Sequence, residues 1–124
     1  IYDLMVVRLD QPVPTSGSNA VPMVKLNDDD SKPLVGQFMR VIGFGATSEG
    51  GNDASILQQT DIKMISTATC NRADAYDGGV DNEAEFCAAH REDGKNKDSC
   101  QGDSGGPVFT TAGNGDAVQV GVVS

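Results

Sequence analysis

The chain has 124 residues, of which 38% are hydrophobic and 22% charged, with 15 glycines and a formal net charge of −9. This length and composition fit one soluble domain with a core, and no run of about 18 apolar residues exists to form a membrane-spanning helix. The few basic residues are scattered along an acidic chain, so no basic face is expected for binding phosphates. We therefore expect neither a nucleic acid nor a membrane as a partner.

Short apolar stretches between turn residues predict a succession of β-strands. The candidate strands are residues 4–9, 21–26, 37–44, 56–65, 85–89, 108–110 and 120–124. Residues 10–20 hold prolines, serines and a glycine, which is the composition of a linker. Ser66 or Thr67 is a candidate cap for a short helix that runs through Ala75. Many short strands with at most one helix indicate an all-β barrel or sandwich.

Neither the acidic residues nor the cysteines form a recognisable metal-binding pattern. Residues 27–33 are acidic but lack the alternating ligands and the glycine turn of a calcium loop. The three cysteines, Cys70, Cys87 and Cys100, include no C-x-x-C pair, so no zinc site is expected. Their odd number indicates a free thiol, an intermolecular bridge or a missing segment. Because both ends of the chain lie in strand-like sequence, we expect a piece of a longer protein.

The segment that indicates chemistry most clearly is residues 97–107, in which three glycines surround Ser104. Glycine allows positive φ angles, and successive N–H groups in such a turn can converge on one anion. A serine hydroxyl beside such a turn suits acyl transfer, because the N–H groups can receive the oxygen that becomes negative. The alternative interpretation is a glycine-rich β-turn with an incidental serine.

Residues 102–106 also satisfy the G-x-S-x-G pattern of α/β-hydrolases. That pattern places the serine between a strand and a helix. Here a Gly-Gly-Pro sequence follows the serine, and residues 108–110 have the composition of a strand. We therefore reject the α/β-hydrolase interpretation.

Five segments of the chain resemble the trypsin-like (chymotrypsin-family) serine endopeptidases. Residues 98–107, Asp-Ser-Cys-Gln-Gly-Asp-Ser-Gly-Gly-Pro, resemble the nucleophile segment of that family over ten consecutive positions. The other matching segments, in the order in which the family places them, are residues 2–9, 41–47, 85–89 and 120–124. The resemblance therefore extends over essentially the whole chain.

The resemblance implies an all-β fold of two antiparallel β-barrels, the chymotrypsin-like double barrel, with the active site between them. Residues 1–13 are expected to end the N-terminal barrel, and residues 14–22 to link the two barrels. Residues 23–124 are expected to form most of the C-terminal barrel, which this chain leaves incomplete.

The family's disulfide bridges imply a pairing for the cysteines. Cys70 is expected to bond to Cys87, and Cys100 to a partner beyond residue 124. A further family bridge joins the positions of Met39 and Thr110, and both of its cysteines are absent here. Disulfides form in oxidising compartments, so the resemblance implies a secreted, extracellular protein.

The resemblance also implies catalytic roles. Ser104 matches the nucleophile, and Asp3 matches the buried carboxylate that orients the catalytic histidine. The backbone N–H groups of Gly102 and Ser104 match the oxyanion hole. Asp98 matches the floor of the specificity pocket, where a carboxylate favours a cationic side chain and so cleavage after Arg or Lys. The other substrate-binding residues implied by the resemblance are Ser99, Gln101 and Ser124.

One further carboxylate, Asp103, matches the residue that pairs with the amino terminus released on zymogen cleavage. We reject Ile1 as that terminus, because it lies only two residues before Asp3, whereas the family's terminus lies far upstream.

The catalytic histidine of the family lies upstream of Asp3, and this chain has one histidine, His90, expected in a solvated loop. We therefore expect the chain alone to be inactive. The leading interpretation is a serine endopeptidase that cleaves proteins or peptides after Arg or Lys and is open to protein inhibitors. No cofactor is implied, and no residue is assigned to a metal. The alternative is a non-catalytic homologue that acts as a secreted binding protein.

Overall fold

The structure is a computed structural model, and it describes residues 4–113 and 115–124. Within these residues it has seven strands and one short helix, which confirms the all-β prediction. The elements are β1 (Lys25–Leu26), β2 (Phe38–Gly43), β3 (Gln58–Ile65), α1 (Thr67–Cys70), β4 (Cys87–Glu92), β5 (Lys95–Lys97), β6 (Pro107–Thr111) and β7 (Ala117–Val122). No helix among the described residues has the length and apolar character needed to cross a membrane.

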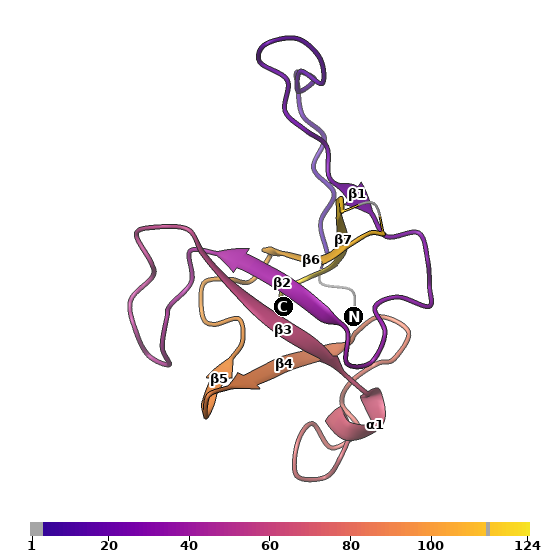
Figure 1. Cartoon of the computed structure of the whole chain (residues 1–124), viewed down its shortest axis with the longest axis vertical. Coiled ribbons are helices and arrows are strands. Elements are labelled where there is room, and N and C mark those ends of the chain that lie inside the picture. Colours follow the sequence, from indigo (N-terminus) through magenta and orange to yellow (C-terminus); the bar gives the residue numbers. More distant parts are fainter. Residues whose placement is uncertain (1–3, 114) are drawn as a thin grey trace.

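The strands form one sheet in the order β1-β7-β6-β2-β3-β4-β5 (Figure 1). All neighbouring pairs are antiparallel except β1 and β7, a pair of two residues each that is parallel. Strand β6 lies beside β2 although more than 60 residues separate them in the chain, so the pairing is non-local. Because the two strands are antiparallel, the end of β2 at Gly43 lies near the segment that leads into β6 at Pro107.

The core lies on one face of this sheet and follows the alternation of the strands. Met39 and Val41 on β2 are buried, and Arg40 between them is exposed. Ile62 on β3 and Val108 on β6 complete the buried cluster. Burying such a side chain contributes about 1.5–3 kcal/mol, so this cluster stabilises the sheet.

The opposite face of the sheet carries charge. Arg40 lies directly across from Asp61 on β3, and its guanidinium donates two hydrogen bonds to the carboxylate, of 2.7 and 3.0 Å. These bonds hold the pKa of the Asp61 carboxyl below its ordinary value.

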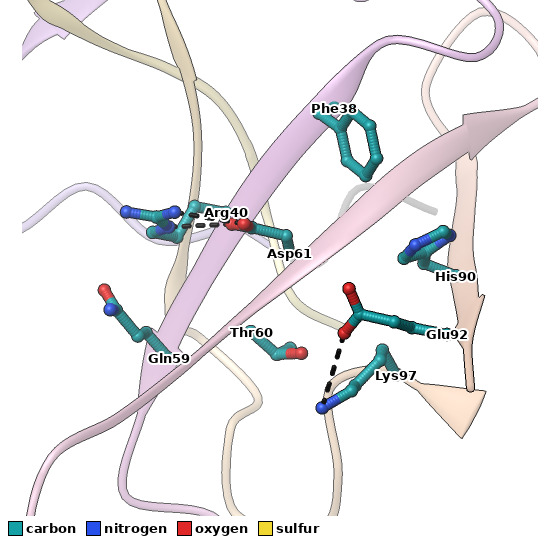
Figure 2. A pocket seen from close by; sticks show the side chains of 8 residues that line it. All are labelled: Phe38, Arg40, Gln59, Thr60, Asp61, His90, Glu92 and Lys97. Carbon is teal, nitrogen blue, oxygen red and sulfur yellow. Dashed lines mark hydrogen bonds and ion pairs between the residues drawn. The ribbon is translucent and has the colours of Figure 1, made fainter. Parts of the chain in front are cut away.

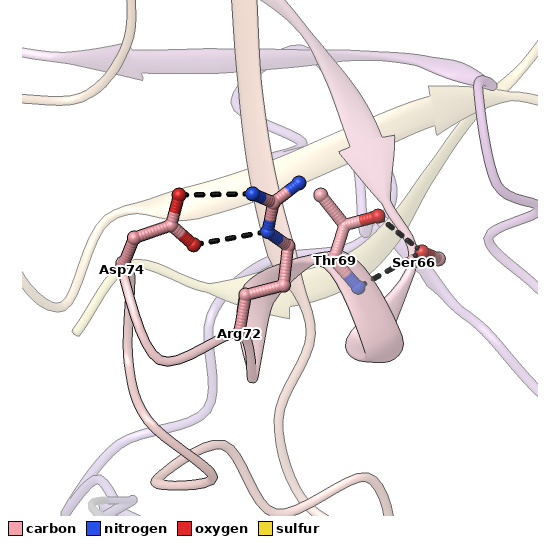
Figure 3. A network of polar contacts seen from close by, with 4 residues as sticks. All are labelled: Ser66, Thr69, Arg72 and Asp74. Atoms are coloured by element: carbon pink, nitrogen blue, oxygen red, sulfur yellow. Dashed lines mark hydrogen bonds and ion pairs between the residues drawn. The ribbon is translucent and has the colours of Figure 1, made fainter.

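The short helix follows β3 and is shorter than predicted. The Ser66 side chain caps it by accepting the N–H of Thr69 at 3.2 Å, which confirms one of the two candidate caps (Figure 3). The helix ends at Cys70 and does not reach Ala75. The cause is Asn71, whose side chain bonds both the N–H and the carbonyl of Val80 and so fixes the chain in a loop. Beyond it, Arg72 and Asp74 form an exposed ion pair, also drawn in Figure 3.

The predicted disulfide between Cys70 and Cys87 is present, with Cα atoms 6.4 Å apart. It joins the end of helix α1 to the start of strand β4 and closes the loop between them. Cys70 is buried, and Cys100 is a free thiol in this chain. The predicted bridge between Cys70 and Cys87 is therefore confirmed, and the pairing expected for Cys100 stays a prediction.

Two of the predicted strands differ from the structure. Residues 4–9 pair with no other described strand and are exposed, with Val6 99% and Met5 84% accessible. The prediction of a buried strand there is wrong for this chain, because an apolar run needs a neighbouring strand and a covering layer to be buried. Residues 21–26 form a strand only at Lys25–Leu26. The division into two barrels and a linker stays a prediction.

Candidate active site

The candidate site is built on the segment that joins β5 to β6, residues 98–106, called the serine loop here. Its turns depend on glycine at two positions, since Gly102 has a φ of +91° and Gly105 a φ of +82°. Gly106 is also constrained by space, because a Cβ there would lie 2.7 Å from the carbonyl oxygen of Asp103. The glycines therefore give the chain around Ser104 a conformation that other residues would strain.

The side chain of Asp103 attaches the serine loop to the end of strand β2. Its Oδ1 accepts the N–H of Gly45 at 2.9 Å, and its Oδ2 accepts the N–H of Cys100 at 3.0 Å. A Cβ on Gly43 or on Gly45 would collide with this carboxylate, so the two glycines leave the space that it occupies. The expected pairing of Asp103 with a released amino terminus is not tested, and Ile1 lies outside the described residues.

Backbone hydrogen bonds hold the serine loop at two further points. On one side, the Ala46 N–H donates to the carbonyl of Gln101 at 2.8 Å. On the other side, Val123 accepts the N–H of Gly105 at 2.7 Å and donates its own N–H to Gly106 at 2.9 Å. The loop is thus fixed between the β2–β3 connection and the segment after β7.

The N–H groups of the serine loop that have no hydrogen bond among the described residues include those of Gly102 and Ser104. Between them, Asp103 donates its N–H to the carbonyl of Cys100 at 3.0 Å. Gly102 and Ser104 are both exposed, and the Ser104 hydroxyl has no partner within the described part of the chain. An exposed hydroxyl with two unused amide donors beside it has the components needed for acyl transfer.

Asp98 lies at the start of the serine loop, directly after strand β5. Its carboxylate is accessible to solvent in this chain and borders a pocket of about 370 Å³ that Ala89 and His90 also line. Partial burial raises the pKa of the Asp98 carboxyl, and the N–H of Ser99, which donates to Oδ1 at 2.8 Å, opposes that shift. Removing water from a carboxylate disfavours its charged form unless a cation approaches.

The structure places the other expected site residues around the serine loop, except for Asp3. Ser99 contacts Asp98 through its N–H, and Gln101 is exposed, with its side chain accepting a hydrogen bond from the Cys100 thiol at 2.9 Å. Ser124 is exposed and follows Val123, which bonds the loop. Asp3 lies outside the described residues, so its position relative to Ser104 is not described.

The single histidine lies elsewhere, and its predicted setting is wrong. His90 is half-buried on strand β4 and not in a solvated loop, because β4 pairs with β3 and β5 on its two sides. Its ring packs edge-on against Phe38, with the ring centroids 5.2 Å apart, at the pocket shown in Figure 2. Ser104 lines neither of two pockets that His90 borders. The structure thus gives His90 no role beside the serine.

One residue of the site was not found by sequence reasoning. Asp53 lies on the β2–β3 connection, and its Oδ1 is 2.9 Å from the point that a Cβ on Gly102 would occupy. A turn at residues 48–52 is readable in the sequence, but nothing in it indicates that Asp53 meets a glycine 49 positions later. Within the described ranges, no three His, Cys, Asp or Glu side chains lie close enough to hold a metal ion.

Comparison with known proteins identifies the family. A family model described as Trypsin matches residues 1–124, the whole chain. The chain belongs to the trypsin family. The resemblance of the five segments is therefore confirmed, and membership of the trypsin family implies the chymotrypsin-like β-barrel fold, with which the all-β sheet agrees.

Curated trypsin-family relatives align over most of this chain. This chain is 39% identical to transmembrane protease serine 11E of Mus musculus over 109 aligned residues. The alignment covers 88% of this chain and 25% of that protein. The chain is 36% identical over 123 residues to trypsin 5G1 of Aedes aegypti, covering 99% of this chain and 42% of that protein. Serine proteinase stubble of Drosophila melanogaster is 34% identical to this chain over 125 aligned residues. That alignment covers 99% of this chain and 15% of the stubble protein. The chain spans less than half of each relative.

Proposed function

We propose that this chain supplies the nucleophile, the oxyanion hole and the pocket acid of a serine endopeptidase. The observation that carries the proposal is the exposed Ser104 hydroxyl flanked by the unused N–H groups of Gly102 and Ser104. In a glycine turn of this kind most N–H groups find an acceptor within the protein, as those of Gly105 and Gly106 do. Donors left free beside a free hydroxyl are suited to an oxygen of the substrate.

The mechanism is the one for which the trypsin family is itself the standard example. The Ser104 hydroxyl attacks the substrate carbonyl and gives its proton to the histidine that the family places upstream, which Asp3 orients. The carbonyl oxygen becomes negative and is held by the N–H groups of Gly102 and Ser104. The C–N bond then breaks, the leaving amine takes the proton from the histidine, and water hydrolyses the resulting ester on Ser104 by the reverse steps.

We propose that the substrate carries Arg or Lys on the acyl side of the cleaved bond, with its cationic side chain on Asp98. The raised pKa of Asp98 supports this, because a partly desolvated carboxylate is stabilised by a cation and not by a neutral side chain. Ser99, Gln101 and Ser124 are assigned to the rest of the substrate-binding surface. Protein inhibitors are expected to occupy the same surface.

Two properties of the protein follow from the same assignment. The Cys70–Cys87 disulfide supports an oxidising, extracellular location. The 124-residue chain by itself should not turn over substrate, because a serine hydroxyl without a base is a weak nucleophile and His90 packs against Phe38 instead.

The experiment is hydrolysis of an arginyl ester by the full-length protein and by its Ser104→Ala variant. The proposal expects hydrolysis by the first and a loss of several orders of magnitude in kcat for the second. A full-length protein that folds but neither hydrolyses the ester nor reacts with an active-site-directed phosphonate would be the non-catalytic, partner-binding homologue instead.

A further inference from the structure

The fold gathers basic side chains that are scattered in the sequence onto one face of strands β2 to β5. The whole chain has 18 acidic and 9 basic residues, so no basic surface is expected from its composition. Four of the nine basic residues nevertheless meet on the face of the sheet opposite the core, called the basic face here: Arg40, Lys63, Lys95 and Lys97.

The pairing of β2 with β3 places two of these cations. Lys63 lies directly across from Phe38, and its ammonium is 4.3 Å from the centre of the Phe38 ring. Arg40 is two residues beyond Phe38 on β2, so its side chain points to the same side of the sheet. The ring therefore lies between two positive groups.

The β4–β5 hairpin brings the other two cations to the same face. Lys97 lines one pocket together with Phe38 and Arg40. Lys95 is two residues before Lys97 and lies directly across from Glu92, which lines that pocket as well. Lys95 is thus on the pocket side of the hairpin.

The pocket in the basic face has a volume of about 290 Å³ and presents unused hydrogen-bonding groups (Figure 2). The Thr60 hydroxyl and the Gln59 amide both line it, and neither side chain bonds to another described residue. The guanidinium of Arg40 has N–H groups beyond the two that it gives to Asp61. These donors suit a carboxylate.

The acids that line the pocket leave two of the cations uncompensated. Asp61 accepts both hydrogen bonds from Arg40, and the Glu92 carboxylate lies 4.0 Å from the Lys97 ammonium. Lys63 and Lys95 form no ion pair with any acid in the described part of the chain. The basic face therefore keeps two positive charges, one on β3 and one on the hairpin.

We propose that the basic face is a docking surface for an acidic, extended segment of a protein substrate. Charge complementarity is the argument, since acidic side chains of such a segment would meet Lys63 and Lys95. A peptide can also set an apolar side chain on Phe38, which is 53% exposed. A polymer with a phosphate or sulfate on every unit would have to lie against the carboxylates of Asp61 and Glu92.

The basic face adjoins the pocket acid of the proposed site. His90 and Lys97 line both the pocket of this face and the pocket that Asp98 borders. A segment docked here would hold the rest of its chain near Asp98. The assignment of the segment to a substrate rests on the proposed function, whereas the docking itself does not.

The test is the binding of a short fluorescent peptide of glutamate, leucine and serine to the full-length protein, measured by anisotropy. The matched neutral peptide has glutamine in place of each glutamate. Neither peptide contains Arg or Lys, so neither needs Asp98. The acidic peptide should bind at least about fivefold more tightly than the neutral one, and the difference should shrink in high salt.

Removing the two uncompensated charges should weaken the binding of the acidic peptide. Lys63→Gln combined with Lys95→Gln should lower its affinity by about three- to tenfold, because each exposed pair contributes about two- to fivefold. Lys25→Gln combined with Arg72→Gln is the matched control, since it removes two exposed cations elsewhere and should change the affinity by less than about twofold. Arginyl ester hydrolysis should stay unchanged in both double variants.

Equal binding of the two peptides, or equal losses in the two double variants, would overturn the docking surface even where the ester is hydrolysed and the proposed function stands. A heparin oligosaccharide or a DNA duplex that binds more tightly than the acidic peptide through the same lysines would overturn the choice of a peptide.

The link to a substrate is tested by adding the acidic or the neutral segment to an arginyl peptide substrate. The acidic segment should raise kcat/KM for the native protein by about three- to tenfold, and Lys63→Gln with Lys95→Gln should abolish that gain. Binding of the acidic peptide without any hydrolysis of the ester would support the docking surface and overturn the proposed function.

Discussion

The carboxylate of Asp103 accepts the N–H of Gly45 at 2.9 Å, joining two segments that are 58 residues apart in the chain. The same carboxylate accepts the N–H of Cys100, so it is shared between the start of the β2–β3 connection and the serine loop. This arrangement needs a residue without a side chain at Gly43 and Gly45, where a Cβ would collide with Asp103. The geometry around Ser104 therefore depends on a strand end far away in the sequence.

Substituting Gly43 tests this dependence. Gly43→Ala forces a methyl group against the Asp103 carboxylate and should lower the free energy of unfolding by about 1–3 kcal/mol, together with the activity of the full-length protein. Denaturant unfolding and ester hydrolysis measure the two effects. Gly113→Ala is the control, because a Cβ there meets nothing within 4 Å. Equal behaviour of the two variants would show that Asp103 does not occupy the space beside Gly43.

Much of this site could be predicted from the sequence, because its chemistry is concentrated in ten consecutive residues. The nucleophile segment and the pairing of Cys70 with Cys87 follow from the resemblance, and the pairing is present in the structure. The nearness of Asp53 to Gly102 could not be predicted, because it arises where two loops meet and leaves no pattern in either one.

The errors in the predicted elements have physical causes of the same kind. The apolar run at residues 4–9 has the composition of a buried strand, but composition cannot supply the neighbour that burial needs. The expected helix after Ser66 is too long, because the bonds from Asn71 to Val80 that stop it involve a residue nine positions away. The polar residues around His90 predict a loop, whereas pairing with β3 and β5 makes that segment a strand.

Asp98 determines the preference for basic substrates in the proposed function. Asp98→Ser should lower kcat/KM for an arginyl substrate by at least about tenfold more than for an apolar one of the same length, because only the cation loses its partner. Parallel assays of the two substrates with the full-length protein measure the ratio. Equal losses on both substrates would contradict the role of Asp98 and leave a general effect on the serine loop as the explanation.

The pair of Arg40 and Asp61 predicts a pH dependence of stability. The guanidinium lowers the pKa of the Asp61 carboxyl in the folded protein. As the pH falls, this carboxyl is therefore protonated at a higher pH in the unfolded protein than in the folded protein. The stabilisation is therefore complete above the ordinary carboxyl pKa and is lost as the pH falls through the lowered one. A double-mutant cycle with Arg40→Met and Asp61→Asn should give a small favourable coupling at neutral pH.

That coupling should disappear at low pH and shrink in high salt, because both side chains are about half exposed. Urea unfolding at several pH values measures it. A coupling that persists after the carboxyl is protonated would mean that packing, and not charge, joins the two strands there.

The disulfide between Cys70 and Cys87 closes a loop over a sequence separation of 17 residues. Replacing both cysteines with alanine should lower the free energy of unfolding by about 3 kcal/mol, mainly because the unfolded chain gains freedom. Thermal unfolding of the full-length protein and the variant, each under oxidising and reducing conditions, measures the loss. Cys100→Ser removes the other expected bridge and leaves the 70–87 loop closed, so replacing Cys70 and Cys87 in that background should cost the same amount. Equal stability of the double variant and the oxidised protein would contradict the prediction.

In the proposed mechanism Ser104 attacks a carbonyl whose oxygen is held by the N–H groups of Gly102 and Ser104. The most direct measurement is a crystal structure of the full-length protein inactivated by an arginine-like phosphonate. The expected result is a bond from the Ser104 oxygen to phosphorus and one phosphoryl oxygen about 2.7–3.1 Å from both amide nitrogens. A phosphonate attached elsewhere, or a phosphoryl oxygen turned away from those two amides, would contradict it.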